Sequence, residues 1–267
     1  MRIGVVGVAG RMGRNVVQQV AAASGCVLSA ACDRPGAAGI GQDAGLLAGL
    51  EALGVIVGDN PAEVFAASQA VIDFTTPDAA AHHAALAVEH GCALVVGTTG
   101  LGRAVEAALA EAARHVAIVV SPNMSLGVNL LAGLVERVAR SLDVSFDIEI
   151  VEMHHRAKVD APSGTALQLG RAAAKGRGVR LEDPLVSVRV RDGHTGTRPW
   201  GSIGFATLRG GDVVGDHTVI FAGEGERLEL THKASSRSIF AKGAVRAARW
   251  TEGRPPGLYG MADVLGL

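Results

Sequence analysis

The chain of 267 residues has few of the features that mark secreted, membrane or nucleic-acid-binding proteins. Its three cysteines, Cys26, Cys32 and Cys92, are unclustered and lie in apolar runs, which is typical of reduced packing residues rather than of a disulfide framework. No uninterrupted apolar run reaches about 18 residues, so no membrane span is expected. The net charge is −1 and Lys and Arg form no block, so neither nucleic acid nor an anionic membrane is an expected partner.

Two further absences narrow the class of protein. No group of Cys, His or carboxylate residues has the spacing of metal ligands, so no metal is expected. The opening residues MRIGVVGVAG lack a charged segment, a long apolar core and a cleavage site, so we expect a cytoplasmic protein without a secretory signal. With 48% hydrophobic residues, the chain can bury a substantial core and is expected to form two lobes.

Short apolar runs alternate with helical segments over the first half of the chain. This alternation predicts a Rossmann-like α/β domain with a doubly wound parallel sheet. Ligands of such sheets bind beyond the carboxyl ends of the strands. The segments expected at that edge are the FTTP run ending at Pro77, Gly97 to Gly100, and Ser121 to Met124. His82, His83 and His90 lie in a predicted helix and are interpreted as surface or packing residues away from this edge.

Glycines between the first predicted strand and helix form a GxxGxxG pattern at Gly7, Gly10 and Gly13. Such glycines allow a tight turn and a close approach to a pyrophosphate at the helix N-terminus. Asp33 ends the second predicted strand, where an acid can bind the ribose hydroxyls of a dinucleotide. Arg34 follows and can meet a 2′-phosphate, so we expect NADH, NADPH or both as cofactor. The alternative is a glycine-rich turn in an ordinary α/β domain.

The stretch EMHHRAKVDAPSGTA, residues 152–166, gathers several catalytic side chains in a loop after a predicted strand at 145–153. The imidazoles of His154 and His155 and the ammonium of Lys158 can move protons and hold anions. The turn Ser163, Gly164 and Thr165 offers hydroxyl and N–H groups to a carboxylate. We therefore expect a small acidic substrate. The alternatives are one buried and one solvated histidine without a catalytic role, and Ser163 as the N-cap of a helix at 165–174.

Several strand-like runs fill residues 185–232 without long helices between them, which predicts a mixed or antiparallel sheet. An open sheet has a face to cover, so self-association is expected. Arg237 follows this region and is a candidate clamp for a substrate carboxylate, although a capping or surface Arg is the alternative. The final helix is expected to return to the first domain.

The motifs together resemble the bacterial dihydrodipicolinate reductase family. They are GVAGRMG, DFTTP, GTTG, SPNMSLGVN, HHRAKVDAPSGTA and THKASSR, and they span nearly the whole chain. The resemblance implies a dinucleotide-binding domain of residues 1–124 plus 238–267 and a substrate-binding and oligomerisation domain of residues 125–237. It also implies a homotetramer that takes part in lysine biosynthesis through diaminopimelate.

The family resemblance implies a role for each motif. His154 is the implied proton donor and acceptor and Lys158 the implied proton donor, with the division between them open. His155, Gly164 and Thr165 are the implied substrate contacts, in addition to Ser163 and Arg237. The implied cofactor-binding residues are Gly7, Val8, Ala9, Gly10, Arg11, Met12, Asp33, Gly97, Thr98, Thr99, Ser121, Pro122, Asn123 and Met124.

The implied reaction is hydride transfer from NADH or NADPH to an unsaturated cyclic dicarboxylate, followed by protonation of the resulting enamine carbon. Two other functions stay open at this point. One is a two-domain dehydrogenase with a different carbonyl or imine substrate. The other is a nucleotide-binding sensor that has lost catalysis, in which His154 or Lys158 would be expected to be replaced, whereas both are present.

Overall fold

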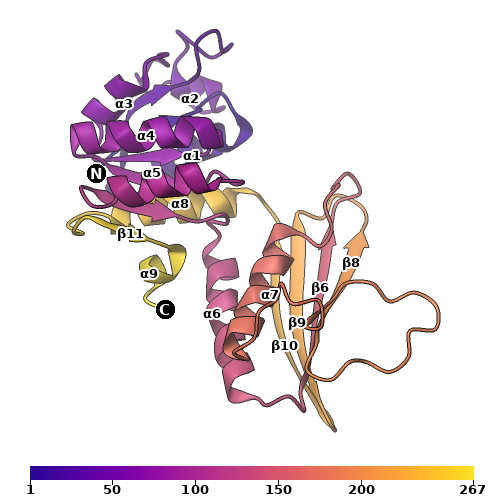
Figure 1. Cartoon of the computed structure of the whole chain (residues 1–267). Coiled ribbons are helices and arrows are strands. Elements are labelled where there is room, and N and C mark those ends of the chain that lie inside the picture. The colour runs from indigo at the N-terminus through magenta and orange to yellow at the C-terminus, as the bar shows by residue number, and fades with distance from the viewer. The chain divides into compact units, whose positions relative to one another are not determined.

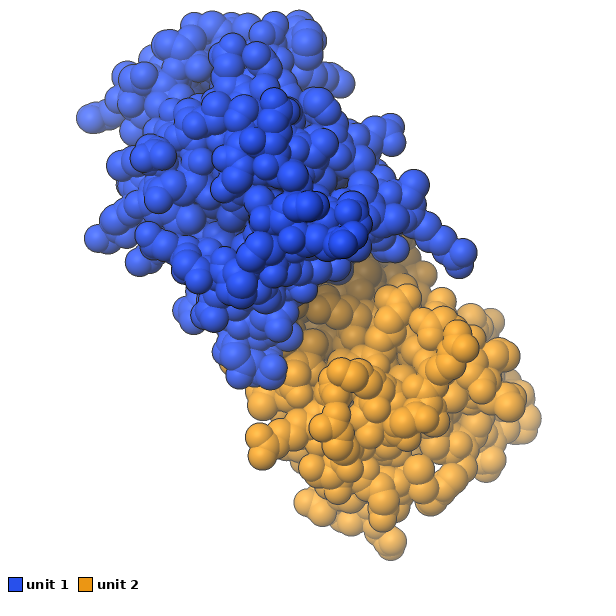
Figure 2. Space-filling view, turned by 60° about the vertical axis from the view of Figure 1, so that its left-hand side comes forward, with its two compact units in different colours: residues 1–126, 238–267 blue, residues 127–237 orange.

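The computed structural model describes residues 1–267 and divides into two compact units (Figures 1 and 2). Unit 1 comprises Met1–Leu126 and Ser238–Leu267, and unit 2 comprises Gly127–Arg237. The sequence placed the first crossing at 124/125 and the second at 237/238, so the first differs by two residues and the second coincides. None of the helices combines the length and the apolar composition that a membrane span needs.

Unit 1 is built on a six-stranded parallel sheet with the order β11-β5-β4-β3-β1-β2. Its strands are β1 (Arg2–Val6), β2 (Val27–Cys32), β3 (Ala70–Asp73), β4 (Ala93–Val96), β5 (Ala117–Val120) and β11 (Gly257–Tyr259). The chain adds β2 on one side of β1 and β3 on the other, so the winding direction reverses there. This confirms the predicted doubly wound sheet and places its ligand crevice beyond the ends of β1 and β3.

Helices cover both faces of this sheet (Figure 1). They are α1 (Arg11–Ala22), α2 (Ala44–Leu47), α3 (Pro61–Ala67), α4 (Pro77–His90), α5 (Arg103–Ala112), α8 (Ser238–Trp250) and α9 (Met261–Leu265). Residues at the ends of these helices determine where the helices begin and end. For α4, the hydroxyl of Thr76 accepts from the N–H of Ala79, Pro77 opens the first turn, and Gly91 ends the helix in the left-handed region at φ 60°.

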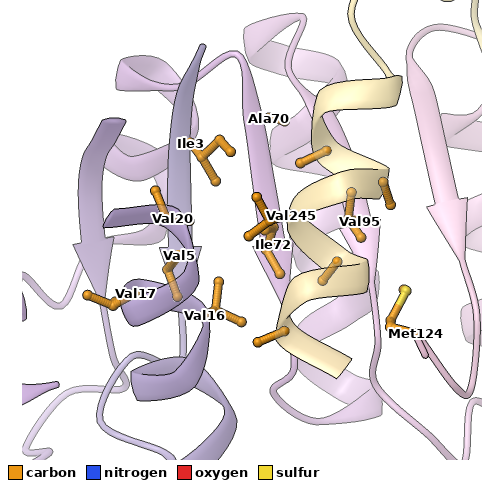
Figure 3. Packing of buried hydrophobic residues seen from close by; sticks show 14 of the residues in the cluster. Ile3, Val5, Val16, Val17, Val20, Ala70, Ile72, Val95, Met124 and Val245 are labelled. Atoms are coloured by element: carbon orange, nitrogen blue, oxygen red, sulfur yellow. The ribbon is translucent and has the colours of Figure 1, made fainter. Parts of the chain in front are cut away.

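Helix α8 completes one face of the unit 1 core. It packs with α1 against the sheet, and Figure 3 shows Val245 facing Ile72 on β3. Gly243 permits this close packing, because a Cβ there would lie 1.7 Å from the carbonyl oxygen of Met124. This last long helix belongs to unit 1 together with the first 126 residues.

The run VIVGDN, residues 55–60, has apolar residues that predict a strand edge, but it forms no strand and contributes only isolated bridges, such as that between Ile56 and Asp43. The carboxylate of Asp43 accepts hydrogen bonds from five backbone N–H groups, those of Gly45, Leu46, Leu53, Gly54 and Val55. These donors are therefore committed to a compact loop, and the segment reaches the sheet only through the bridge between Gly58 and Cys32.

Unit 2 contains a five-stranded mixed sheet with the order β10-β9-β6-β8-β7. Its elements are α6 (Leu126–Ser141), β6 (Asp147–His154), α7 (Gly164–Gly176), β7 (Ser187–Val188), β8 (Ile203–Arg209), β9 (Gly215–Gly223) and β10 (Glu226–Ala234). β6 pairs parallel with β8 and antiparallel with β9, as a mixed sheet requires. Residues of α6 and α7 pack on one face to form the core of this unit.

Strand β6 carries both apolar and ionisable residues on its buried face. Burial alternates strictly along the strand, and Ile148, Ile150, Glu152 and His154 share the buried side. Because successive side chains of a strand point to opposite faces, a carboxylate and an imidazole are placed next to each other at the end of an apolar row. The strand therefore leads directly into the candidate active site.

Candidate active site

A cavity of about 770 Å³ lies beyond the carboxyl ends of β1, β2 and β3 in unit 1. Five of the predicted cofactor residues line it: Gly7, Ala9, Gly10, Asp33 and Arg34. The other predicted residues of the glycine turn lie elsewhere. Val8 is buried in the core, Arg11 is exposed at the start of α1, and Met12 packs against the core.

The glycine turn has the geometry that its spacing predicts. Gly7 has φ +70°, a conformation that residues with a Cβ rarely adopt. A Cβ at Gly13 would lie 2.3 Å from the carbonyl oxygen of Gly7, so α1 can approach the turn only with glycine there. Asp33 ties the end of β2 to the turn by accepting from the N–H of Ala9 at 2.7 Å. The side chain of Arg14, which the sequence interpretation missed, also lines the cavity and donates to the carbonyl of Ala9.

A buried carboxylate organises the second wall of the cavity. Asp73, at the end of β3, accepts from the N–H and hydroxyl of Thr75 at 2.7 and 2.6 Å and from the hydroxyl of Thr98 at 3.3 Å. Its other oxygen lies 2.7 Å from Nδ1 of His83. His83 was interpreted as lying away from the carboxyl edge of the sheet. This interpretation is wrong, because the residue lines the cavity at that edge. The Ala-rich helix α4 has little hydrophobic periodicity, so its sequence gave no signal of this orientation.

The predicted segments Gly97 to Thr99 and Ser121 to Met124 follow neighbouring strands but are not among the residues that line this cavity. Gly97 packs closely on the ring of Phe74, which does line it. The N–H of Ser121 donates to Val96, and its hydroxyl donates to the carbonyl of Asn123. Both segments thus lie along the carboxyl edge of the sheet, while Met124 itself is buried.

A second group of polar residues surrounds His154 in unit 2. Nδ1 of His154 lies 2.6 Å from Oε2 of Glu152, whose side chain is 1% exposed. Arg209 on β8 binds both oxygens of the same carboxylate, at 2.8 and 3.0 Å. The N–H of Ser163 donates to Oε1 at 3.0 Å. One carboxylate thus joins the predicted catalytic histidine to the predicted substrate turn.

The charge states of this pair follow from opposing effects. Burial disfavours ionisation of Glu152, but the hydrogen bonds from Arg209 and His154 outweigh it and hold the pKa of this carboxyl below its usual range. Burial also lowers the pKa of His154 below its ordinary value, and Glu152 offsets this only in part. The site therefore favours a carboxylate beside a histidine that gives up its proton readily.

The remaining predicted residues of unit 2 form a more exposed group. Lys158 donates to the carboxylate of Asp160 at 2.7 Å, and Nη2 of Arg237 lies 3.5 Å from Nε2 of His155. Of the two histidines, His154 is buried and His155 is half-buried. Ser163 is the N-cap of α7, since its hydroxyl accepts from the N–H of Ala166 at 3.1 Å, so the capping interpretation is confirmed.

His217 on β9 is a further member that the sequence interpretation missed. Its Nε2 lies 3.0 Å from the hydroxyl of Ser163, and its ring meets that of His154 edge to face with 5.1 Å between centroids. Nδ1 of His217 is buried without a hydrogen-bond partner. Burial lowers the pKa of His217 to about 4, with a further contribution from the neighbouring His154. The imidazole of His217 is therefore neutral at pH 7.

This neutral histidine makes stability depend on pH. Its pKa is about 4 in the folded protein against an ordinary value of 6.5, so the unfolded chain binds a proton first as the pH falls. We expect the contribution of His217 to the free energy of unfolding to be complete above pH 6.5. Between pH 6.5 and 4 we expect it to fall by about 3 kcal/mol. Urea unfolding of wild type and His217→Gln across this range measures it. Equal losses of stability in the two proteins would contradict the assignment.

Comparisons with known proteins give matches over both units. Residues 1–124 match the family model "Dihydrodipicolinate reductase, N-terminus", and residues 127–265 match "Dihydrodipicolinate reductase, C-terminus". The 4-hydroxy-tetrahydrodipicolinate reductase of Methylocella silvestris is 59% identical over the whole chain and 97% of its own length. That of Rhizobium rhizogenes is 57% identical, with the same coverage.

The fold is also that of a solved structure. The dipicolinate-bound dihydrodipicolinate reductase from Paenisporosarcina sp. TG-14 superposes with a TM-score of 0.78, covers 98% of both chains and is 24% identical. This likeness concerns the fold, whereas the two relatives and the two family models cover the sequence itself. The chain belongs to the dihydrodipicolinate reductase family, as its motifs indicated.

Proposed function

We propose that this chain reduces 4-hydroxy-tetrahydrodipicolinate, or the dihydrodipicolinate formed from it by dehydration, to tetrahydrodipicolinate in lysine biosynthesis. The observation that carries the proposal is 59% identity over the whole chain to a reductase of that name. The carboxylate-bound His154 beside the Ser163 turn supports it, because this group combines a proton carrier with a helix N-terminus suited to an anion.

The test is oxidation of NADH and NADPH by the purified chain, with the substrate generated in situ by dihydrodipicolinate synthase. We expect turnover with at least one of the two cofactors. Absence of turnover despite measurable cofactor binding would favour a nucleotide-binding sensor. Turnover of a different imine or carbonyl substrate, with none of the dipicolinate precursor, would favour the alternative dehydrogenase.

The family implies a nicotinamide cofactor, and the residues of unit 1 fit its dinucleotide. A Cβ at Gly7 would lie 2.6 Å from the side chain of Thr75, so only glycine lets the turn pack this closely at the cavity, as the turn of a dinucleotide site requires. The N-cap of α1 is Gly10, which has no side chain to occupy the helix start, as suits an anion site. Asp33 and Arg34 lie on the same cavity for the adenosine ribose. When bound, NADH or NADPH supplies the hydride.

Arg34 is expected to favour NADPH over NADH. Replacing it with alanine removes a cation that can meet the 2′-phosphate, so we expect the Kd for NADPH to rise about tenfold or more and that for NADH to change much less. Fluorescence titration of both cofactors measures the two constants. Arg103→Ala, an exposed arginine at the start of α5, is the matched control. Equal changes for both cofactors would contradict a role in phosphate recognition.

On the substrate side, we assign different tasks to the three residues of the turn. The hydroxyl and N–H of Ser163 are engaged by Ala166, His217 and Glu152, so this residue fixes the turn. Gly164 has open space where a Cβ would stand, so a carboxylate can approach the start of α7 there. Gly164, Thr165, His155 and Arg237 are the proposed contacts of the substrate's two carboxylates.

His154 is placed to carry a proton at Nε2. Its Nδ1 faces a carboxylate that can only accept, so Nδ1 keeps its hydrogen and Nε2 is the atom that gains and loses a proton. Protonation of the enamine carbon from this atom completes the reduction. Lys158, held by Asp160, is the second candidate acid and can instead bind a carboxylate.

Self-association through unit 2 is part of the proposal. The sheet face opposite α6 and α7 carries apolar residues, among them Leu208, which is 50% exposed. Burial of such a face between copies would remove apolar surface from water. We propose the homotetramer that the family resemblance implied, in the cytoplasm, as the working state of the enzyme.

A further inference from the structure

The carboxylate of Glu152 is the common anchor of three separate segments of unit 2. It receives hydrogen bonds from His154 on its own strand, from Ser163 before α7 and from Arg209 on β8. Thr207, also on β8, donates to it at 3.3 Å. Burying an ionised carboxylate that is 1% exposed costs free energy unless its oxygens accept hydrogen bonds. These donors are therefore needed to keep Glu152 ionised.

We propose that Glu152 and Arg209 are positioning residues for proton transfer by His154: the carboxylate fixes the orientation and tautomer of the imidazole, and the guanidinium fixes the carboxylate. This inference rests on the proposed function. It assigns roles to two residues that the chain's motifs did not single out as a site, one of which lies 57 positions from its partner.

The geometry leaves the imidazole of His154 one arrangement. Nδ1 is bound to Glu152, and the ring of His217 meets it edge to face, so rotation about the side chain would break both contacts. On its other edge, Nε2 faces Gly215, where a Cβ would lie only 2.9 Å away. Glycine at this position therefore avoids a clash with Nε2, while the opposite edge is held.

The charged and titratable groups around His154 act in opposite directions on its proton. Glu152 favours the imidazolium, whereas Lys158 and Arg209 disfavour it, and His217 stays neutral near pH 7. Removing the charge of Glu152 and removing that of Arg209 should therefore move the titration of His154 in opposite directions. Damage to the fold alone gives no such reversal of sign.

The same carboxylate links the histidine to the substrate turn. Oε1 of Glu152 holds the N–H of Ser163, and Oε2 holds Nδ1 of His154. A displaced carboxylate would thus misplace both the proton carrier and the start of α7. We expect changes at Glu152 to lower kcat and raise KM together, because small misplacements of positioned groups are costly in catalysis.

The experiment is an NMR titration of the histidine nitrogens in the full-length chain, with His154→Ala used to assign the signals. In wild type we expect neutral His154 to carry its hydrogen on Nδ1. In Glu152→Gln we expect its pKa to fall by about one unit and both tautomers to be populated. In Arg209→Gln we expect the pKa to rise by at least about half a unit. The pH dependence of kcat/KM should show the same two opposite shifts.

The matched control is Glu149→Gln. Glu149 is on the same strand and also binds two arginines, Arg191 and Arg198, but it points to the other face. Its replacement is expected to leave the titration of His154 unchanged. Arg209→Lys keeps the charge without the bidentate geometry and should recover part of the loss of kcat.

Three results would overturn the proposal. The first is an unchanged titration of His154 in both Glu152→Gln and Arg209→Gln. The second is a pKa shift in the same direction in these two variants. The third is a shift in Glu149→Gln as large as that in Glu152→Gln. If Glu152→Gln fails to fold, Arg209→Gln and Arg209→Lys still test whether removal of the guanidinium charge raises the pKa of His154. Because the titration needs no turnover, an inactive wild type with the expected shifts would reject the proposed function and leave the positioning roles standing.

Discussion

Replacing His154 with alanine is expected to lower kcat by about a hundredfold or more, as for the loss of a general acid. The affinity for NADH should change little, because the dinucleotide residues belong to unit 1 and His154 to unit 2. Steady-state kinetics over a range of pH, together with cofactor titration, measures both quantities. The remaining activity should also lose the pH dependence that belongs to the imidazole.

The matched control for this change is His194→Ala, since His194 is an exposed histidine of the same unit. It should retain wild-type kcat. If His154→Ala keeps kcat within about threefold of wild type, less than a general acid contributes, the proton must come from Lys158 or from water. A parallel loss of NADH binding would instead indicate that the variant is misfolded.

Gly243→Ala is expected to be the most destabilising single-methyl change in unit 1. The added Cβ would lie 1.7 Å from the carbonyl oxygen of Met124, and a backbone atom cannot move aside as a flexible side chain can. Either α8 leaves the sheet or the chain shifts at Met124, so we expect a loss of about 3 kcal/mol or more in the free energy of unfolding. Denaturant unfolding measures this loss.

The control is Gly102→Ala, because a Cβ at Gly102 has nothing within 4 Å and its backbone is extended. That variant should unfold close to wild type. Met124 also ends one of the proposed cofactor segments, so any folded Gly243→Ala protein should bind NADH more weakly. A variant as stable as wild type would show that α8 can shift without cost.

The sequence predicted those parts of the site that lie close together along the chain. The glycine turn and Asp33 follow from strand-to-helix spacing, and the alternation of β6 places Glu152 on the same face as His154. Arg209 and His217 belong to strands that pair with β6 in register, and no local pattern encodes that pairing. Long-range register therefore supplied the half of the His154 site that the motifs did not contain.

The same reasoning explains the errors in unit 1. VIVGDN has the apolar content of a strand, but the carboxylate of Asp43 binds the N–H of Val55 at its start and that of Gly54 before it, and so closes a loop. His83 lies in an Ala-rich helix whose buried face has no distinctive residues, so only its contact with Asp73 reveals its orientation. In both cases one buried or loop-closing carboxylate overrides local propensity.

The division of unit 1 into two chain segments has a consequence for its synthesis on the ribosome. Unit 2 is continuous, so all its residues have been translated before Ser238 is added. Unit 1 begins first but receives α8, which shares one face of its sheet with α1, only with the final segment Ser238–Leu267. The inserted unit is therefore the first with a complete core, and the N-terminal sheet keeps part of one apolar face uncovered until α8 has been made.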